Sequence, residues 1–384
     1  MSCLRGVLSL LSASLLLLGT GMVSNADEVG WENQTQINDD SSGTNSELFD
    51  YSISEEGVVI TKFKGSVLSS GISIKIPSRI DDSYVIGIGD GAFYKSNISE
   101  IVIPEGVKTI GNYAFGECRL LSKVNLPSTL EGLGVGAFQD CTELQKVSIP
   151  KNVKIISTST FSGCTKLLNV NMYTGVESIG SMAFANCVAL KGVVIPGSVK
   201  NIGTYAFDSC FGLKSVMLQE GVRVLEAGAF YRCTSLESIY LPESIVFIDI
   251  SVFKNCKNLK YVAVENVNVE YFDSSLFGEG EFSRIFTDCN KLILCSYPGS
   301  TSEKHANTYK VPFKAVDLKS LRALMGDVDQ DGKITSSDSL LTLRESVGLE
   351  YLTEYQKRVI DIDEDGTVSS ADSLSILRRS VGLN

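Results

Sequence analysis

The C-terminal part of the 384-residue chain repeats one acidic loop after 34 positions. In each copy aspartates occupy loop positions 1, 3, 5 and 12, and a glycine occupies position 6. The residues are Asp327, Asp329, Asp331, Gly332 and Asp338 in the first loop, and Asp361, Asp363, Asp365, Gly366 and Asp372 in the second. Carboxylates at positions 1, 3 and 5, with a glycine at the sharp turn, form the ligand pattern of a calcium loop. Two such loops at a fixed offset predict a module that binds two Ca²⁺ ions.

Each loop runs into an apolar segment with helical spacing. Leu340, Leu343 and Val347 follow the first loop at positions i, i+3 and i+7, and a matching segment follows the second loop. This spacing predicts an amphipathic helix in each half. Gly348 and its copy Gly382 stand where a helix C-terminal glycine is common. No comparable amphipathic segment precedes the first loop, so the unit is loop–helix rather than helix–loop–helix.

Two loop–helix units with aspartate at position 12, where an EF-hand has glutamate, resemble a dockerin type I module over residues 320–384. The resemblance implies a small all-α calcium-binding domain that binds a cohesin domain of a scaffoldin. The calcium ligands that it implies are Asp327, Asp329, Asp331, the Lys333 carbonyl, Thr335 and Asp338 in one loop, and Asp361, Asp363, Asp365, the Thr367 carbonyl, Ser369 and Asp372 in the other. The cohesin contacts that it implies are Ser336, Ser337, Leu340, Arg344, Ser370, Ala371, Leu374 and Arg378.

The two halves of this module are nearly interchangeable in sequence, so the two binding orientations known for the family are expected here. An alternative is that the ions only stabilise a small domain. A module with so little apolar core needs its metals to fold in either case.

The N-terminus has the pattern of a secretory signal. Arg5 provides a positive charge, Val7 to Leu18 is apolar, and Ser24-Asn25-Ala26 offers a small-residue cleavage site. We therefore expect a signal peptide at residues 1–26, followed by a disordered acidic spacer at residues 27–47. The apolar run is too short to span a bilayer, and no later stretch predicts a transmembrane segment. The mature protein is expected to be secreted and extracellular, attached to a cellulosome-like complex.

The charge balance argues against one class of partner. The formal net charge is −11 and the isoelectric point lies near 4.8. Nucleic-acid-binding domains are usually basic, so no nucleic-acid partner is expected. Much of the negative charge lies in the calcium loops, where bound ions would neutralise it.

The middle of the chain is periodic. A phenylalanine recurs at an interval of 22 residues once and 23 residues six times, and from the second copy onward a cysteine follows three residues later. The phenylalanines are Phe93, Phe115, Phe138, Phe161, Phe184, Phe207, Phe230 and Phe253; the cysteines are Cys118, Cys141, Cys164, Cys187, Cys210, Cys233 and Cys256. One such repeat cannot bury its apolar residues alone. Stacking the repeats about 4.8 Å apart would pair their strand-like pieces and align each buried residue with its copies.

The repeat consensus, roughly I-G-x-x-A-F-x-x-C-x-x-L-x-x-V-x-I-P, resembles BspA-type leucine-rich repeats of bacterial surface proteins. The resemblance implies a leucine-rich-repeat solenoid that is mainly β, with parallel strands and short helical turns. We expect an N-terminal cap at residues 48–90, repeats at 91–295 and a C-terminal cap at 296–316. Phe286 and Cys289 restore the spacing after an insertion of ten residues that follows Phe253.

The cysteines of the repeats form one column. Equivalent positions in successive coils favour buried free thiols, although neighbouring copies near 5 Å apart would also permit disulfides. Cys289 and Cys295, in the irregular last coil, are the stronger candidates for a disulfide. A zinc site is not expected, because the chain has one histidine and no C-x₂-C spacing.

No catalytic constellation is apparent in the sequence. His305 is the only histidine, so any Cys–His or Ser–His pair would depend on it. No nucleophile-elbow, P-loop or zinc-protease motif occurs. A glycosidase carboxylate pair can still arise from residues that are far apart in sequence. We therefore expect a non-enzymatic protein.

The repeat strands predict one outward-facing row. Its members are Asn125, Ser148, Asn171, Val194, Met217, Tyr240 and Ala263, with Tyr261 nearby. The row is apolar from Val194 to Tyr240, and contiguous exposed apolar surface commonly marks an interaction site. We expect Val194, Met217, Tyr240 and Tyr261 to contact a protein or glycan ligand; the alternative is an ordinary strand surface.

Together these features favour an exported, non-catalytic cellulosome-type component that functions in plant polysaccharide degradation. Its dockerin would bind cohesin through calcium, and its repeats would present a protein- or glycan-binding surface. Two other functions remain open on sequence alone. One is a carbohydrate-active hydrolase component whose site lies unrecognised in the repeats, and the other is a cell-surface adhesin.

Overall fold

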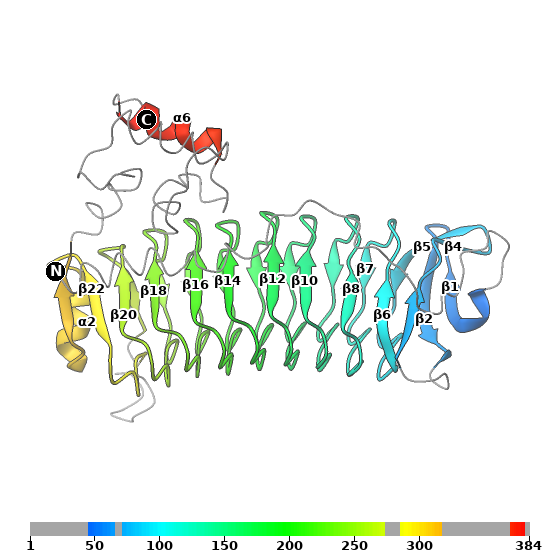
Figure 1. Ribbon diagram of the computed structural model, residues 1–384, viewed down its shortest axis with the longest axis horizontal. Coiled ribbons are helices and arrows are strands. Elements are labelled where there is room, and N and C mark those ends of the chain that lie inside the picture. Colours follow the sequence, from blue (N-terminus) through cyan, green and yellow to red (C-terminus); the bar gives the residue numbers. More distant parts are fainter. Residues whose placement is uncertain (1–44, 66–70, 273–284, 317–368, 381–384) are drawn as a thin grey trace, which may run out of the picture.

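The computed structural model describes residues 45–65, 71–272, 285–316 and 369–380. Residues 45–65, 71–272 and 285–316 form a solenoid, whose coils lie side by side along the long axis from the blue N-terminal end to the yellow C-terminal end (Figure 1). Two walls of short parallel strands enclose one apolar core. The predicted leucine-rich-repeat solenoid is confirmed.

One coil shows how the repeat folds. The two-residue strand β9 (Gly132–Leu133) leads into a turn that carries Phe138, and the longer strand β10 (Lys146–Ile149) follows. Val147 and Ile149 point into the core while the residues between them face outward, as strand alternation requires. Pro150, which cannot donate a backbone hydrogen bond, ends the strand and starts the return turn.

The first wall contains strands that are mostly two residues long. They are β1 (Phe49–Ile53), β2 (Val58–Phe63), β4 (Arg79–Ile80), β5 (Ser83–Ile88), β7 (Thr109–Ile110), β9, β11 (Ile155–Ile156), β13 (Ser178–Ile179), β15 (Asn201–Ile202), β17 (Val224–Leu225), β19 (Phe247–Ile248) and β21 (Glu270–Tyr271). Strands β1 and β2 pair antiparallel, β4 pairs antiparallel with β5, and the other pairs of this wall are parallel.

The second wall contains the strands that carry the L-x-x-V-x-I pattern. They are β3 (Ile72–Lys75), β6 (Ile98–Val102), β8 (Lys123–Asn125), β10, β12 (Asn169–Met172), β14 (Gly192–Ile195), β16 (Ser215–Leu218), β18 (Ser238–Leu241), β20 (Tyr261–Val264), β22 (Ile293–Ser296) and β23 (Phe313–Ala315). This wall consists of four separate sheets, and where the strands of successive repeats pair, residues pair with their copies in the next coil, as Val147 does with Val170. The repeat period therefore sets the register.

Both ends of the solenoid differ from the repeat. At the N-terminal end a 3₁₀ turn (η1, Asn45–Leu48) precedes the antiparallel β1–β2 pair, and Phe49 and Phe63 cover the first ring of the column. At the C-terminal end helix α2 (Thr301–Tyr309) packs near β22 and β23. The Ser300 hydroxyl caps α2 by accepting from the Glu303 amide.

The phenylalanine rings stack along the core. From Phe93 to Phe286 consecutive ring centroids lie 4.9–5.8 Å apart, with interplanar angles of 2–24°. Phe286 continues the column after the insertion, as its spacing predicted. Full burial of each ring contributes about 1.5–3 kcal/mol relative to exposure. The column thus contributes to coil-to-coil stability together with the other residues of the same core.

The turn around each phenylalanine uses an uncommon backbone conformation. In the coil of Phe115, Tyr113 and Glu117 have φ of 51° and 55°, and the equivalent residues of the other coils are also left-handed. This conformation costs roughly 1 kcal/mol or more at a residue other than glycine. Backbone hydrogen bonds from these two amides to Val135 and Gln139 in the next coil, at 2.8 and 2.7 Å, offset that cost.

Candidate functional site

Most of the predicted calcium site lies outside the described residues. This holds for Asp327, Asp329, Asp331, Lys333, Thr335, Asp338, Asp361, Asp363, Asp365 and Thr367, and for the predicted cohesin contacts Ser336, Ser337, Leu340 and Arg344. The donor set of carboxylate, hydroxyl and carbonyl oxygens is the kind that Ca²⁺ prefers. The residues of the chain therefore fit the ion chemically.

The end of the second loop and the helix after it are described. The predicted second helix is present as α6 (Ser370–Ser380), which contains Asp372, Ala371 and Arg378. Ile376 is fully buried, whereas Leu374 is 49% exposed. Ser370 is also exposed and Ser369, the predicted ligand at loop position 9, is half-buried just before the helix. Exposure of Ser370 and Leu374 leaves them accessible to a partner.

The predicted outward row lies on the outer face of the second wall, but it is less exposed than strand alternation suggests. Val194 and Tyr240 are half-buried, Met217 is only 9% exposed and Ala263 is fully buried. Each side chain packs against its copies in the neighbouring coils, as Val194 does beside Met217. The Tyr240 hydroxyl also contacts the carboxylate of the buried residue Glu265.

A second apolar cluster lies at the C-terminal end of this outer face. Ala263 and Cys295 form its buried centre, and Tyr240, Tyr261 and Tyr297 pack against them as partly buried neighbours. Tyr240 and Tyr261, two of the predicted contact residues, are thus brought together by β18 and β20. Outward-facing apolar residues here form a local cluster rather than an open stripe.

None of the cysteines that the structure describes forms a disulfide. The expectation that Cys289 and Cys295 pair is wrong, because Cys289 belongs to the inner column and Cys295 faces outward. In the column each sulfhydryl donates to the carbonyl oxygen of a phenylalanine in the preceding coil, at 3.0–3.3 Å. Satisfied, buried thiols in every coil explain why the spacing repeats without disulfides.

One cleft of 360 Å³ lies at the C-terminal end, and its lining includes Phe286, Cys289, His305 and Tyr309. Because His305 is the only histidine of the chain, a Cys–His pair would have to form in this cleft. Burial raises the pKa of the Cys289 thiol to about 12, and that thiol already donates to the Phe253 carbonyl. His305 stacks on Tyr271 with ring centroids 4.2 Å apart. A protonated thiol is a poor nucleophile, so the cleft does not support cysteine chemistry.

The structure therefore defines a β-solenoid of stacked repeats and a separate C-terminal helix, α6, and the sequence places an acidic loop directly before that helix. The family model of the "BspA type Leucine rich repeat region" matches residues 86–211 and 177–304 in six copies, which is more than half of the chain. The chain belongs to the BspA-type leucine-rich-repeat family. The model of the "Dockerin type I domain" matches residues 325–380.

These two module types are non-catalytic. Leucine-rich repeats are protein-interaction modules, dockerin type I domains generally bind calcium, and a dockerin implies a cohesin as its partner. Both families are typically extracellular or surface-associated. Within the part of the chain that the structure describes, no helix is both long and apolar enough for a membrane span.

Several solved structures are similar to this chain. The Treponema pallidum (T. pallidum) leucine-rich repeat protein is 28% identical over 57% of this chain and 91% of that chain, with a TM-score of 0.42. A leucine-rich cell surface protein from Faecalibacterium prausnitzii is 22% identical over 70% of this chain and 98% of that chain, with a TM-score of 0.37. A leucine-rich-repeat protein from Bacteroides ovatus is 18% identical over 70% and 98%, with a TM-score of 0.30. No curated protein matches the chain.

Proposed function

We propose that the protein is an exported, non-catalytic component of a cellulosome-type complex. Its dockerin binds a cohesin on a scaffoldin in a calcium-dependent manner, and its repeats present a protein- or glycan-binding surface in plant polysaccharide degradation. The observation that carries this proposal is the duplicated aspartate loop within residues 325–380, where the dockerin model matches.

Calcium acts on the fold of the module rather than on a substrate. In the proposal Asp327, Asp329, Asp331 and Asp338 hold one ion, and Asp361, Asp363, Asp365 and Asp372 hold the other. The Lys333 and Thr367 carbonyls, with Thr335 and Ser369, complete the two ligand sets. The clustered carboxylates of each loop repel one another. A bound Ca²⁺ ion neutralises their charge, and this makes folding of the loop favourable.

Cohesin contacts arise from equivalent positions in the two halves. Ser336, Ser337, Leu340 and Arg344 of one half correspond to Ser370, Ala371, Leu374 and Arg378 of the other. Exposure of Ser370 and Leu374 on α6 supports a contact role for the second half. The similarity of the halves supports binding in either of two orientations.

The repeat surface has a second role in this proposal. Val194, Met217, Tyr240 and Tyr261 form a partly buried outer face that is a candidate contact for a protein or glycan ligand. Its tyrosines and its small exposed area are typical of the anchors at protein interfaces rather than of a catalytic cleft.

Charge substitutions at the contact positions test both orientations. With Ser336→Glu and Ser337→Glu together, the second half remains intact, so we expect cohesin affinity to fall by less than about tenfold. Adding Ser370→Glu and Ala371→Glu removes both surfaces and should weaken binding by at least about a hundredfold, since several contacts at the centre of an interface are lost. Surface plasmon resonance of the full chain on a cohesin-bearing scaffoldin measures both values in calcium.

Calcium titration of the same variants is the control, because these positions are not ion ligands and uptake should not change. If the fourfold variant still binds like the unmodified chain, the contact assignment is wrong. If the first pair alone abolishes binding, only one orientation operates.

A further inference from the structure

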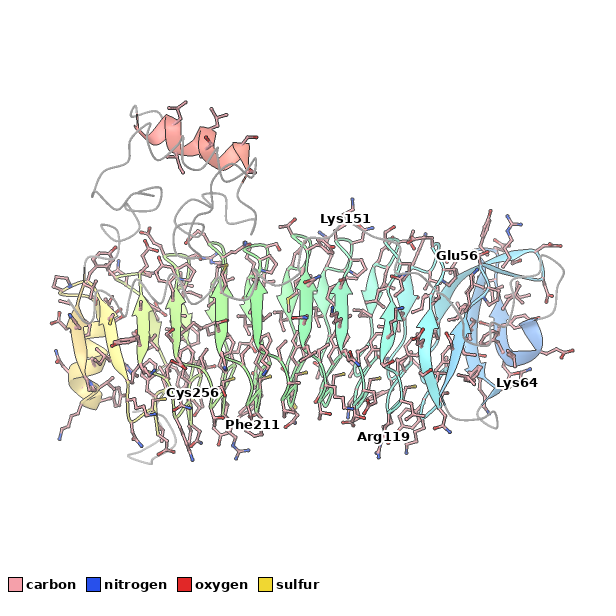
Figure 2. The ribbon with its side chains drawn as sticks, in the orientation of Figure 1. Glu56, Lys64, Arg119, Lys151, Phe211 and Cys256 are labelled. Carbon is pink, nitrogen blue, oxygen red and sulfur yellow. The ribbon has the colours of Figure 1, made fainter. Side chains whose placement is uncertain are left out.

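Three of the exposed aromatic residues of the solenoid, Tyr94, Tyr113 and Phe211, lie on one of its edges. We define the turn edge as the turns that carry the phenylalanine column, within five residues of each phenylalanine. Figure 2 shows Arg119 and Phe211 on this long edge, and Lys151 on the opposite one. The large apolar side chains of the turn edge that are at least 37% exposed are Tyr94, Tyr113, Leu120, Val135, Met182 and Phe211.

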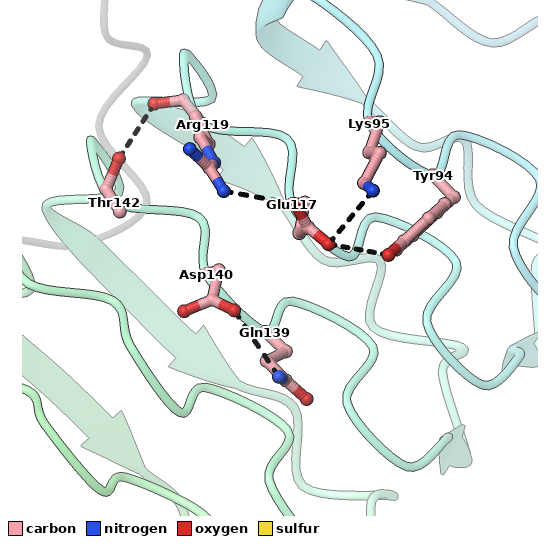
Figure 3. Close-up of polar contacts among 7 residues, drawn as sticks. All are labelled: Tyr94, Lys95, Glu117, Arg119, Gln139, Asp140 and Thr142. Carbon is pink, nitrogen blue, oxygen red and sulfur yellow. Dashed lines mark hydrogen bonds and ion pairs between the residues drawn. The ribbon is translucent and has the colours of Figure 1, made fainter.

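At the N-terminal coils two tyrosine rings are held in fixed positions on this edge. The Tyr94 hydroxyl donates to the Glu117 carboxylate at 2.6 Å, and the Lys95 ammonium lies 5.0 Å from the Tyr94 ring centroid and 3.4 Å from Glu117 (Figure 3). Arg119 pairs with the same carboxylate at 3.1 Å. Tyr113 lies over Gly136, where an added Cβ would be 2.5 Å from the ring.

A related arrangement recurs at the C-terminal coils, where Tyr205 and Tyr231 are both half-buried. Tyr205 lies over Gly228, where an added Cβ would be 2.4 Å from the ring. Tyr205 and Tyr231 meet edge to face with centroids 5.8 Å apart, and the Arg232 guanidinium lies 4.8 Å from the Tyr231 centroid. Each cluster therefore combines two tyrosines, a cation on one ring and a glycine beneath the other.

The spacing of the tyrosines and the narrow width of the turn edge indicate which kind of partner fits this surface. Tyr113 and Tyr205 are equivalent residues four coils apart, about 19 Å, and Tyr94 and Tyr231 are six coils apart, about 29 Å. A strip that is only one ring wide is narrow, whereas a stable protein interface needs about 800 Å² from each partner. The turn edge fits a linear polymer better than a folded protein.

An extended peptide is a poor match for this strip. The amides of Tyr113 and Phe115 already donate to carbonyls in the next coil, both at 2.8 Å. The edge therefore lacks the unpaired backbone groups that strand addition uses. Charges of both signs, such as Lys95 beside Glu117, also make it a poor surface for a polyanion.

We propose that the turn edge binds a neutral polysaccharide chain that runs along the solenoid axis, with sugar rings stacked on Tyr113 and Tyr205. Sugar rings have apolar faces that pack on an aromatic ring, and their hydroxyls can bond to both carboxylates and cations such as Glu117 and Arg232. A stretched hexose chain advances by roughly one coil spacing per residue, so contacts can repeat along the edge. This inference rests on the proposed function, because it names the ligand class of the repeats.

Affinity electrophoresis of the full chain tests the assignment. The gels contain hydroxyethylcellulose, xylan or galactomannan as neutral probes and polygalacturonate as the polyanion. We expect at least one neutral probe to retard the unmodified chain, and polygalacturonate not to. Tyr113→Ala with Tyr205→Ala should raise the dissociation constant at least about tenfold, and the corresponding double phenylalanine variant should keep most of the affinity because the rings remain.

Tyr84→Ala with Tyr173→Ala is the matched control, because these tyrosines are 58% and 55% exposed and lie off the turn edge. This control should bind as the unmodified chain does. Failure of all three neutral probes overturns the ligand class, and unchanged binding by the Tyr113 and Tyr205 alanine variant overturns the location. Cohesin binding by the same samples is independent of both outcomes, so failure here is distinguishable from failure of the dockerin assignment.

Discussion

Raising the pH above 9 is expected to unfold the solenoid through its thiol column. Burial raises the pKa of the eight column thiols above their usual value of 9.0, to about 12 for Cys118 and Cys289. Above pH 9 the unfolded chain releases these protons while the native chain retains them. The contribution to stability is therefore complete below pH 9 and decreases as the pH rises toward the native pKa values.

The expected size of this effect is large. Each thiol lowers the free energy of unfolding by about 1.4 kcal/mol per pH unit in this range, so eight together contribute a slope of about 11 kcal/mol per unit. Typical domains have only about 5–15 kcal/mol of stability. We expect cooperative unfolding between about pH 9 and 11, followed by circular dichroism and by denaturant titration at each pH.

A variant with fewer column thiols isolates the cause. Replacing Cys164, Cys187 and Cys210 by alanine should remove three eighths of the thiol contribution to the slope, whatever it does to stability at neutral pH. Lysines and tyrosines that also titrate at high pH are unchanged in this comparison. An identical slope in the two proteins would show that the thiols are not responsible.

Removing the first carboxylate of both acidic loops is expected to abolish cohesin capture. In the Asp327→Ala, Asp361→Ala variant each loop loses a charged ligand, so neither ion binds at micromolar calcium and the module does not fold. Cohesin affinity should fall by at least about a thousandfold, since coupled folding and binding are lost together. Calcium titration calorimetry and cohesin binding by the full chain measure the two effects.

The solenoid provides the internal control for that variant. Its unfolding transition should be unchanged, because the phenylalanine column is a separate core. Asp82→Ala, which removes an exposed carboxylate of the solenoid, should leave both calcium uptake and cohesin binding intact. Normal cohesin affinity in the loop variant would contradict the assignment of these aspartates.

The amino-acid sequence predicted the solenoid because its signal is periodic. Copies of Phe115 and Cys118 recur together from the second coil onward at positions that must be buried together, and the L-x-x-V-x-I segment alternates as a strand does. The first wall is harder to predict. Strands such as Thr109–Ile110 are two residues long and exist because coil-to-coil hydrogen bonds align them, so no alternation is visible in the sequence.

The surfaces were predictable only in part. Alternation placed Met217 and Ala263 on the outward face, but their burial depends on neighbouring coils and on tyrosines such as Tyr240. The turn edge was missed because Tyr113 and Tyr205 occupy a position that is glycine, serine or methionine in other coils. The sequence does contain a signal for these tyrosines, because the equivalent residue of the next coil is a glycine in both cases: Gly136 after Tyr113 and Gly228 after Tyr205.

The proposed attachment of this protein to a scaffold through two bound calcium ions is tested most directly by one binding measurement. The full chain is passed over an immobilised cohesin-bearing scaffoldin, first in calcium and then in EDTA. We expect tight capture in calcium, complete release in EDTA and recovery of binding when calcium is restored. Equal capture in both buffers, or none in either, would contradict it.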